Sequence, residues 1–176
     1  MLKQSRMSLL ILGVLFSGPA VQAQNALVAS DVAPFVGSWT LDPVKTGGAT
    51  EPERRVITAG PDSMRVEVHR PSDDRPPVLI YNLDGSRNVN SFGSGTATTE
   101  IRRDETGLVT VTVFTVNDRP VTVQERLRVN PEGELTAAVL LRIEHGYEGV
   151  LPALEKRPTN VSETMKYFRK SPPVTP

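Results

Sequence analysis

The sequence has no cysteine, few aromatic residues and no excess of either charge. Among its 176 residues, 20 are basic and 20 acidic, and aromatic side chains make up 5%. The absence of cysteine excludes disulfides, a thiolate nucleophile, a cysteine zinc site and an iron–sulfur cluster. Balanced charge and scarce aromatics argue against nucleic-acid binding, which relies on basic patches and stacking platforms. The length fits a single domain, which packing and strand pairing alone must stabilise.

A short apolar segment near the N-terminus predicts export. Two basic residues precede the apolar run from Met7 to Phe16, and small residues follow it as far as Ala23. This run is too short to cross a bilayer and has the flanks of a secretory signal. We expect residues 1–23 to be a signal peptide cleaved near Ala23, which leaves a periplasmic or secreted chain without a membrane anchor. Residues 24–170 then form one domain, and residues 171–176 a disordered proline-rich tail.

Apolar and polar residues alternate through most of the remaining chain. Clear examples are Met64 to Val68, Leu108 to Val116 and Val121 to Val129. Alternation of this kind is typical of strands with one buried face. Short connections rich in Asp, Asn, Gly and Pro join the runs and favour antiparallel neighbours. We therefore predict an all-β fold, an antiparallel up-and-down meander that closes into a barrel of about eight or nine strands.

Four segments, taken in order, resemble a known family. They are Phe35-Val36-Gly37-Ser38-Trp39-Thr40-Leu41 followed by Lys45, then Tyr81-Asn82-Leu83-Asp84-Gly85, then the strand that carries Glu125 before Asn130-Pro131-Glu132-Gly133, and Tyr167-Phe168-Arg169. Together they resemble the lipocalin-like (calycin-type) small secreted bacterial proteins with Gly-x-Trp on the first strand. The resemblance implies a small barrel with Gly37 and Trp39 at its closed end. It also implies that Arg169 packs over the Trp39 ring, where cation–π attraction is favourable.

The more apolar parity of each strand predicts which residues face the barrel lumen. Val78 and Ile80 are the alternative inward pair to Tyr81. If a ligand binds, Glu125 and Tyr81 are the polar groups that would orient it, because binding pockets are mostly apolar with a few placed polar atoms. The expected lumen residues are Met64, Val66, Val68, Tyr81, Val111, Val113, Val123, Glu125, Val139, Leu141 and Tyr167.

Glu125 is the polar exception on an apolar strand face, and it has more than one interpretation. It could orient a ligand or act as a base, it could form a structural ion pair with an arginine, or it could lie at a barrel mouth that water reaches. Arg169 is the expected partner for such a pair. His69 and His145 do not converge with other ligands, so we expect no metal site. No catalytic set and no cofactor motif are recognised.

These observations lead to one expectation and two alternatives. We expect an exported, non-enzymatic lipocalin-like protein that binds a small apolar or amphipathic molecule in the barrel lumen. The first alternative is an envelope interaction or structural module with a solid barrel core. The second is a barrel enzyme that uses Glu125 as an acid or base. The sequence indicates no particular protein partner.

Overall fold

The computed structural model describes residues 26–47, 51–144 and 159–171. The predicted signal peptide and His145 lie outside these residues, as does the tail beyond Ser171. The secondary-structure elements are α1 (Ala29–Val32), η1 (Ala33–Phe35), β1 (Gly37–Leu41), β2 (Arg54–Ala59), β3 (Ser63–His69), β4 (Val78–Asn82), β5 (Asn88–Phe92), β6 (Gly95–Asp104), β7 (Gly107–Val116), β8 (Arg119–Val129), β9 (Leu135–Glu144) and β10 (Thr159–Lys170).

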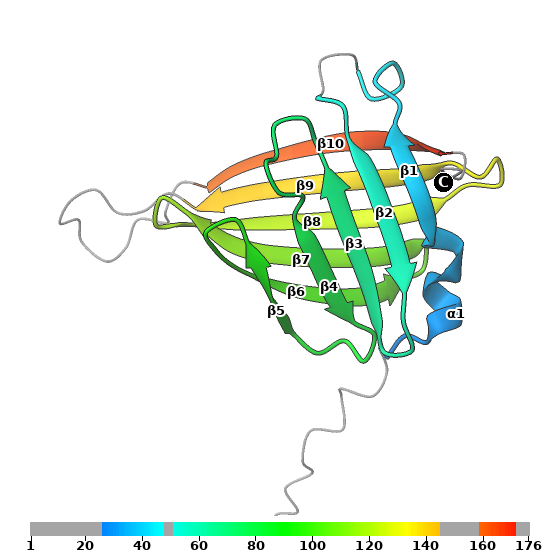
Figure 1. The fold of residues 1–176 in the computed structure, drawn as a ribbon, viewed down its shortest axis with the longest axis horizontal. Helices are drawn as coiled ribbons and strands as arrows, with labels where there is room; N and C mark the ends of the chain where they lie inside the picture. The colour runs from blue at the N-terminus through cyan, green and yellow to red at the C-terminus, as the bar shows by residue number, and fades with distance from the viewer. Residues whose placement is uncertain (1–25, 48–50, 145–158, 172–176) are drawn as a thin grey trace, which may run out of the picture.

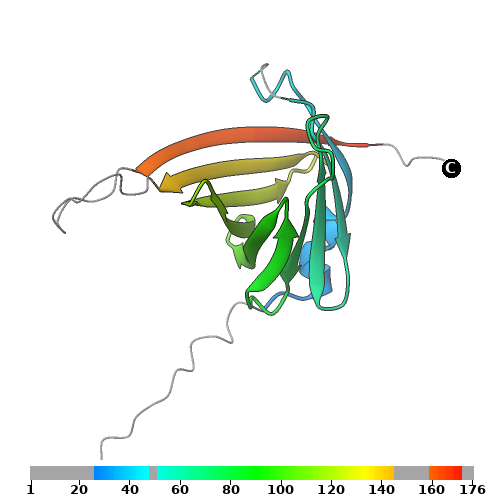
Figure 2. The same cartoon turned by 60° about the vertical axis from the view of Figure 1, so that its left-hand side comes forward.

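All of these strands join in one antiparallel sheet with the order β4-β3-β2-β1-β10-β9-β8-β7-β6-β5. Strands β1 to β5 form a front layer that crosses the layer of β6 to β10 behind it (Figure 1). Seen from another side, the sheet curves so that the two layers face each other across a common interior (Figure 2). The predicted all-β antiparallel meander is confirmed, and it forms a nearly closed barrel.

The described residues form ten strands, which is slightly more than predicted. The strand that sequence reasoning missed is β5, Asn88–Phe92. Its sequence, Asn-Val-Asn-Ser-Phe, lacks the apolar alternation that marks the other strands, because its buried position is held by the polar Asn90. The strand exists because it pairs with β6 over its full length.

The connections between β6, β7, β8 and β9 are the short turns that the sequence predicts. In the β6–β7 turn, Asp104 accepts hydrogen bonds from the backbone amides of Thr106 and Gly107. In the β7–β8 turn, Asn117 and Asp118 both have positive φ, 48° and 59°. Consecutive residues of positive φ are typical of the type I′ hairpin turn, and Asn and Asp tolerate that conformation best after glycine. These turns force neighbouring strands to be antiparallel.

One end of the barrel is closed by α1 and η1, which lie beside the lower end of β1 (Figure 1). Val32 and Phe35 from these turns are buried in the core. The Trp39 indole is also buried, and its Nε1–H donates to the carbonyl oxygen of Phe35 at 2.8 Å. Other fully buried core side chains at less than 2% exposure include Tyr81, Phe168, Ile57, Met64, Leu108 and Leu135.

Gly37 makes the close approach at the start of β1 possible. Its φ is 147°, a conformation that side-chain-bearing residues rarely adopt, and a Cβ there would lie 3.3 Å from Cε of Lys170. Lys170 is directly opposite Trp39 in the β1–β10 register, and its ammonium lies 5.8 Å from the centroid of the indole. The expectation that Arg169 packs over Trp39 is therefore wrong. Arg169 precedes Lys170 by one residue, so its side chain lies on the opposite face of β10. There it forms an ion pair with Asp42.

The two edge strands of the sheet, β4 and β5, meet along a seam that side chains close. The Asn90 side-chain amide accepts from the Ile80 backbone N–H at 2.9 Å and donates to the Ile80 carbonyl oxygen at 3.1 Å. Asn90 also donates to the Thr99 hydroxyl, which donates in turn to the same carbonyl. A primary amide carries both a donor and an acceptor, so Asn90 replaces the missing strand partner of Ile80. The barrel is closed here without a continuous backbone ladder.

Replacing Asn90 by Asp should break this seam. A carboxylate can still accept from Ile80, but it cannot donate to the Ile80 carbonyl, and it would place a charge at a buried position. We expect a loss of about 2 kcal/mol or more in the free energy of unfolding, measured by urea denaturation. Ser91→Asp adds the same charge at the adjacent, exposed position of β5 and should change stability little. Equal effects of the two substitutions would show that Asn90 does not hold the seam.

Candidate functional site

The inner face of the barrel has two unlike walls beyond its closed end. On β8 and β9 the inward side chains are apolar except for Glu125. The register places Val123 opposite Leu141 and Glu125 opposite Val139. On β10 the inward side chains are polar, with Ser162 opposite Leu141. The next inward positions of β10 are Thr164 and Lys166. An apolar wall therefore lies beside a wall of hydroxyl and ammonium groups.

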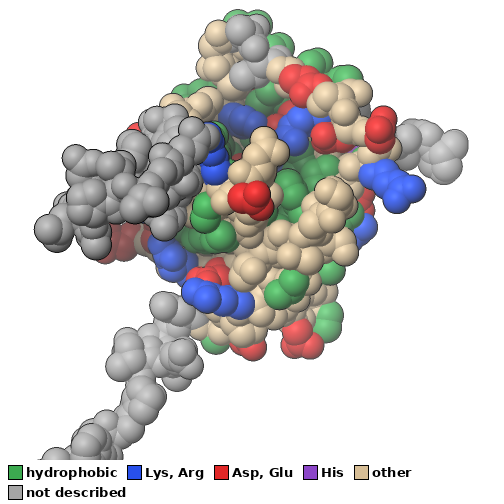
Figure 3. Space-filling view, turned by 90° about the vertical axis from the view of Figure 1, so that its left-hand side faces the viewer, with side chains coloured by type: hydrophobic (Ala, Val, Ile, Leu, Met, Phe, Trp, Pro, Cys, Tyr) green, Lys and Arg blue, Asp and Glu red, His purple; other side chains and the backbone are tan. Residues whose placement is uncertain are grey.

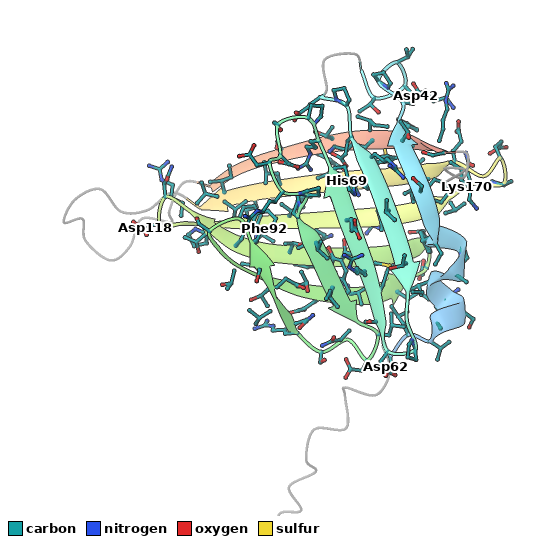
Figure 4. All side chains as sticks on the ribbon, viewed as in Figure 1. Asp42, Asp62, His69, Phe92, Asp118 and Lys170 are labelled. Carbon is teal, nitrogen blue, oxygen red and sulfur yellow. The ribbon has the colours of Figure 1, made fainter. Side chains whose placement is uncertain are left out.

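This part of the interior is open. Val123, Val139 and Leu141 are only half-buried although the register turns them inward. Figure 3, which views this end, shows a hollow whose floor is apolar, with basic side chains at its upper side. Two residues labelled in Figure 4 help to locate the ends of the barrel: Phe92 lies toward the open end and Lys170 lies at the closed end. The ring of Phe92 packs 4.7 Å from that of Phe114 near the opening.

A buried arginine occupies the interior between two carboxylates. Arg55 lies on β2 with its side chain 4% exposed, and its Nε–H donates to Glu53 at 2.6 Å. Its two terminal nitrogens donate to the two oxygens of Glu125, at 3.1 and 2.8 Å. A bidentate arginine–carboxylate pair of this kind is among the stronger hydrogen-bonded ion pairs in proteins. Arg55 therefore links β2 in the front layer to β8 in the back layer.

Glu53 gathers two further cations at the same place. Its second oxygen accepts from Arg70 at 3.2 Å and from Lys166 at 2.8 Å. Burial alone would raise the pKa of Glu53, but the charges and hydrogen bonds of Arg55 and Lys166 outweigh it and lower that pKa to about 2. Burial likewise opposes the charge of Arg55, and Glu125 and Glu53 raise its pKa above the usual value. Both groups are thus ionised at neutral pH.

Aromatic rings enclose this network on two sides. The guanidinium of Arg55 lies 4.7 Å from the centroid of the Phe168 ring, within the range of cation–π attraction. The Tyr81 hydroxyl is 3.2 Å from the Thr112 hydroxyl. Burial, together with the negative charge of Glu125, raises the pKa of Tyr81 to about 12, so the phenol stays protonated at neutral pH. Tyr81 and Glu125, the polar groups expected to orient a ligand, are therefore neighbours in one network.

The structure places eight of the eleven expected lumen residues inside the barrel. Met64, Val66, Val68 and Tyr81 are buried, while Val123, Val139 and Leu141 line the open part. Glu125 also points inward, with its side chain 17% exposed. Whether any of these residues binds a ligand stays a prediction.

Three of the expected lumen residues face outward instead. In β7 the register places Thr110 opposite Glu125 and Thr112 opposite Val123, both of which face inward, so Val111 and Val113 lie on the outer face. Val113 is 39% exposed. In β10 the inward residues are Lys166 and Phe168, and Tyr167 points out between them. The prediction fails for β7 and β10 for the same reason. Their inner faces carry polar groups that contact Tyr81 or Glu53, so the more apolar face of each strand is not the inner one.

The expected pairing of Arg169 with Glu125 is also wrong. The partner is Arg55, which lies two residues before the buried Ile57 and therefore on the same face of β2. The signal in the sequence is the pair Glu53 and Arg55, both on the parity of Ile57, which places opposite charges on one inner strand face. The short apolar run starting at Val56 conceals that parity.

A second depression lies on the outside, next to this network. It is a cleft of about 400 Å³ between the β1–β2 and β3–β4 connections. Leu41 and three prolines line it together with polar and charged residues, among them Glu53 and Arg70. His69 also lines the cleft and contacts Glu67 at 3.2 Å. Within the described ranges, no group of three or more His, Cys, Asp or Glu is placed to hold a metal ion.

The structure resembles solved β-barrel proteins with little sequence identity. A secretory abundant heat soluble protein from Ramazzottius varieornatus superposes with a TM-score of 0.53 at 10% identity, covering 78% of this chain and 96% of that one. A point mutant of the fluorescent protein UnaG covers 80% of this chain and 99% of its own, at 18% identity and a TM-score of 0.35. No protein-family model and no curated protein matches the sequence. No described helix has the length and apolar character to cross a membrane. The comparison with the first protein establishes the fold alone.

The lowered pKa of Glu53 predicts how stability depends on pH. The pKa is about 2 in the folded protein and 4.5 in the unfolded chain, so the unfolded chain binds the extra proton between these values. The stability that ionised Glu53 contributes should be complete above pH 4.5 and should decline as the pH falls toward 2. We expect the difference in unfolding free energy between wild type and Glu53→Gln to shrink over this range. Glu105→Gln, at an exposed turn, is the control. A difference that stays constant from about pH 7 to about pH 2.5 would contradict the assignment.

Proposed function

We propose that this protein is an exported, non-enzymatic binding protein of the lipocalin-like type, released after cleavage near Ala23. Its ligand is a small apolar or amphipathic molecule that enters the open part of the barrel. The single observation that supports this proposal most is the half-buried apolar wall of Val123, Val139 and Leu141 on a concave inner face. Apolar side chains with open space beside them on a concave surface are typical of ligand sites.

The geometry of Glu125 supports binding more than catalysis. Each carboxylate oxygen accepts a hydrogen bond from the buried Arg55. To act as a base, Glu125 would have to give up a hydrogen bond from this buried guanidinium, which would leave part of the cation without its partner. The hydroxyl of Tyr81 is equally engaged, with Thr112. Glu125, whose side chain is partly exposed, would then hydrogen-bond a ligand at the end of the apolar wall. Tyr81 is buried and would support the site from behind rather than contact the ligand.

A pair of tryptophan substitutions on β9 tests the proposal. Leu141 points into the lumen and Leu140, its neighbour, points out, and both are half-buried. The wild type should increase the fluorescence of the neutral dye N-phenyl-1-naphthylamine. Leu141→Trp should fill the open space and reduce dye affinity at least tenfold with little loss of stability, whereas Leu140→Trp should bind the dye like the wild type.

Two results would overturn the binding proposal. Absence of dye binding by the wild type, together with a loss of about 1–3 kcal/mol on Leu141→Trp, is what a solid core would give, because the larger ring would overpack it. That outcome favours the interaction or structural module. Equal loss of dye binding in Leu140→Trp and Leu141→Trp would place the dye outside the lumen.

A further inference from the structure

We infer that the lumen selects a ligand without net charge that carries both a hydrogen-bond donor and an acceptor. The inference rests on the proposed function, since it concerns the class of molecule that the same lumen binds. It follows from the charges that surround the open space and from which of their hydrogen-bonding atoms remain unused.

The charged side chains in this network balance. Three cations, Arg55, Arg70 and Lys166, are in contact with the carboxylates of Glu53 and Glu125 at 2.6 to 3.2 Å. Arg70 is also paired with Asp73, whose carboxylate lies 3.7 Å away. Among the described residues these contacts join three positive and three negative groups. A ligand ion would leave the set with an uncompensated charge in a site that is partly shielded from water, which is unfavourable.

The centre of the network is closed to a ligand. Both Glu53 and Arg55 are nearly inaccessible, with side chains 2% and 4% exposed. Glu53 accepts from three cations, and Arg55 directs its Nε and both terminal nitrogens to carboxylates. Turning either group toward a ligand would leave a buried charge without its partner. The pair therefore acts as a fixed support for the groups on either side of it.

Unused hydrogen-bonding capacity remains on the two outer groups. Glu125 and Lys166 have side chains 17% and 19% exposed. Glu125 keeps free lone pairs, and the Lys166 ammonium uses one of its three N–H groups on Glu53. The first accepts and the second donates. Ser162 and Thr164, exposed on the inner face of β10, add hydroxyls that do both.

This arrangement fits a group such as an amide or a hydroxyl-bearing carbonyl compound, attached to an apolar body. The donor of such a group would bind Glu125 and its acceptor Lys166 or the β10 hydroxyls, while the body covers the wall of Val123 and Leu141. An ionised acid would gain from Lys166 but would meet the negative charge of Glu125. Specificity would then come from repulsion as much as from attraction.

Two dyes that share one skeleton test this selectivity. N-phenyl-1-naphthylamine is neutral, and 1-anilinonaphthalene-8-sulfonate adds one sulfonate to the same ring system. The measured quantity is the ratio of their affinities for wild type, Glu125→Gln and Lys166→Gln, each shown to be folded by circular dichroism and thermal unfolding. Because the ratio compares two dyes on one protein, it cancels any general change in the apolar wall.

We expect the ratio of the two dye affinities to shift in opposite directions in Glu125→Gln and Lys166→Gln. Wild type should prefer the neutral dye. Glu125→Gln leaves one excess positive charge and should improve binding of the sulfonate dye, relative to the neutral one, at least tenfold. Lys166→Gln should weaken binding of the sulfonate dye, relative to the neutral one, by a similar factor. If Glu125→Gln does not fold, the ratio measured for Lys166→Gln alone tests the inference.

Other outcomes overturn the inference. A ratio that neither substitution changes would mean that the charges do not face the ligand. If the wild type bound the sulfonate dye more tightly than the neutral dye, and Lys166→Gln lost this preference, the lumen would instead be suited to an anionic ligand. Binding of the neutral dye without these ratio changes would leave the proposed function intact and remove only its selectivity. Failure of both dyes to bind the wild type would overturn the proposed function and this inference with it.

Discussion

The interior of this barrel depends on one buried cation. Arg55 is almost inaccessible to water, and removing a guanidinium from water is costly unless opposite charges compensate it. Glu53 and Glu125 meet that requirement from two different strands, and the Phe168 ring covers the guanidinium face. The second carboxylate oxygen of Glu53 also needs partners in the interior, and Lys166 and Arg70 donate hydrogen bonds to it. A network of this kind explains why an all-β core contains so many polar residues on its inner face.

The sheet is long enough to curve onto itself, but its edge strands do not form a continuous ladder. At the seam, Asn90 supplies with its side chain what a strand would supply with its backbone, and Thr99 adds a second donor to the Ile80 carbonyl. Closure thus depends on a few side chains, while the opposite side of the barrel is held by full-length pairing of β7 to β10. The open part of the lumen is bounded by this second, rigid side. A binding surface on long paired strands is well suited to fixed geometry.

The fold could be predicted from the sequence because alternation and turn residues are local signals. The turns after Asp104 and Val116 carry the residues that their geometry needs, and the meander follows from them. The site could be predicted only in part. Apolarity marks the inner parity of β3 and β8 but not that of β7, where Thr112 faces inward to contact Tyr81. Arg55 was missed because its partners are 2 and 70 positions away, and only the tertiary structure brings the distant one near.

The central claim is that Arg55 and Glu125 form one coupled unit across the lumen, and a double-mutant cycle tests it most directly. The free energy of unfolding would be measured for wild type, Arg55→Met, Glu125→Met and the double variant. Each single substitution takes one ion-pair partner away from a charge in the interior and should cost about 3–5 kcal/mol. The double variant removes both charges, so its loss should fall short of the sum of the single losses by at least about 1.5 kcal/mol. Losses that add to within about 0.5 kcal/mol would contradict the account, because they would show that the two side chains do not depend on each other.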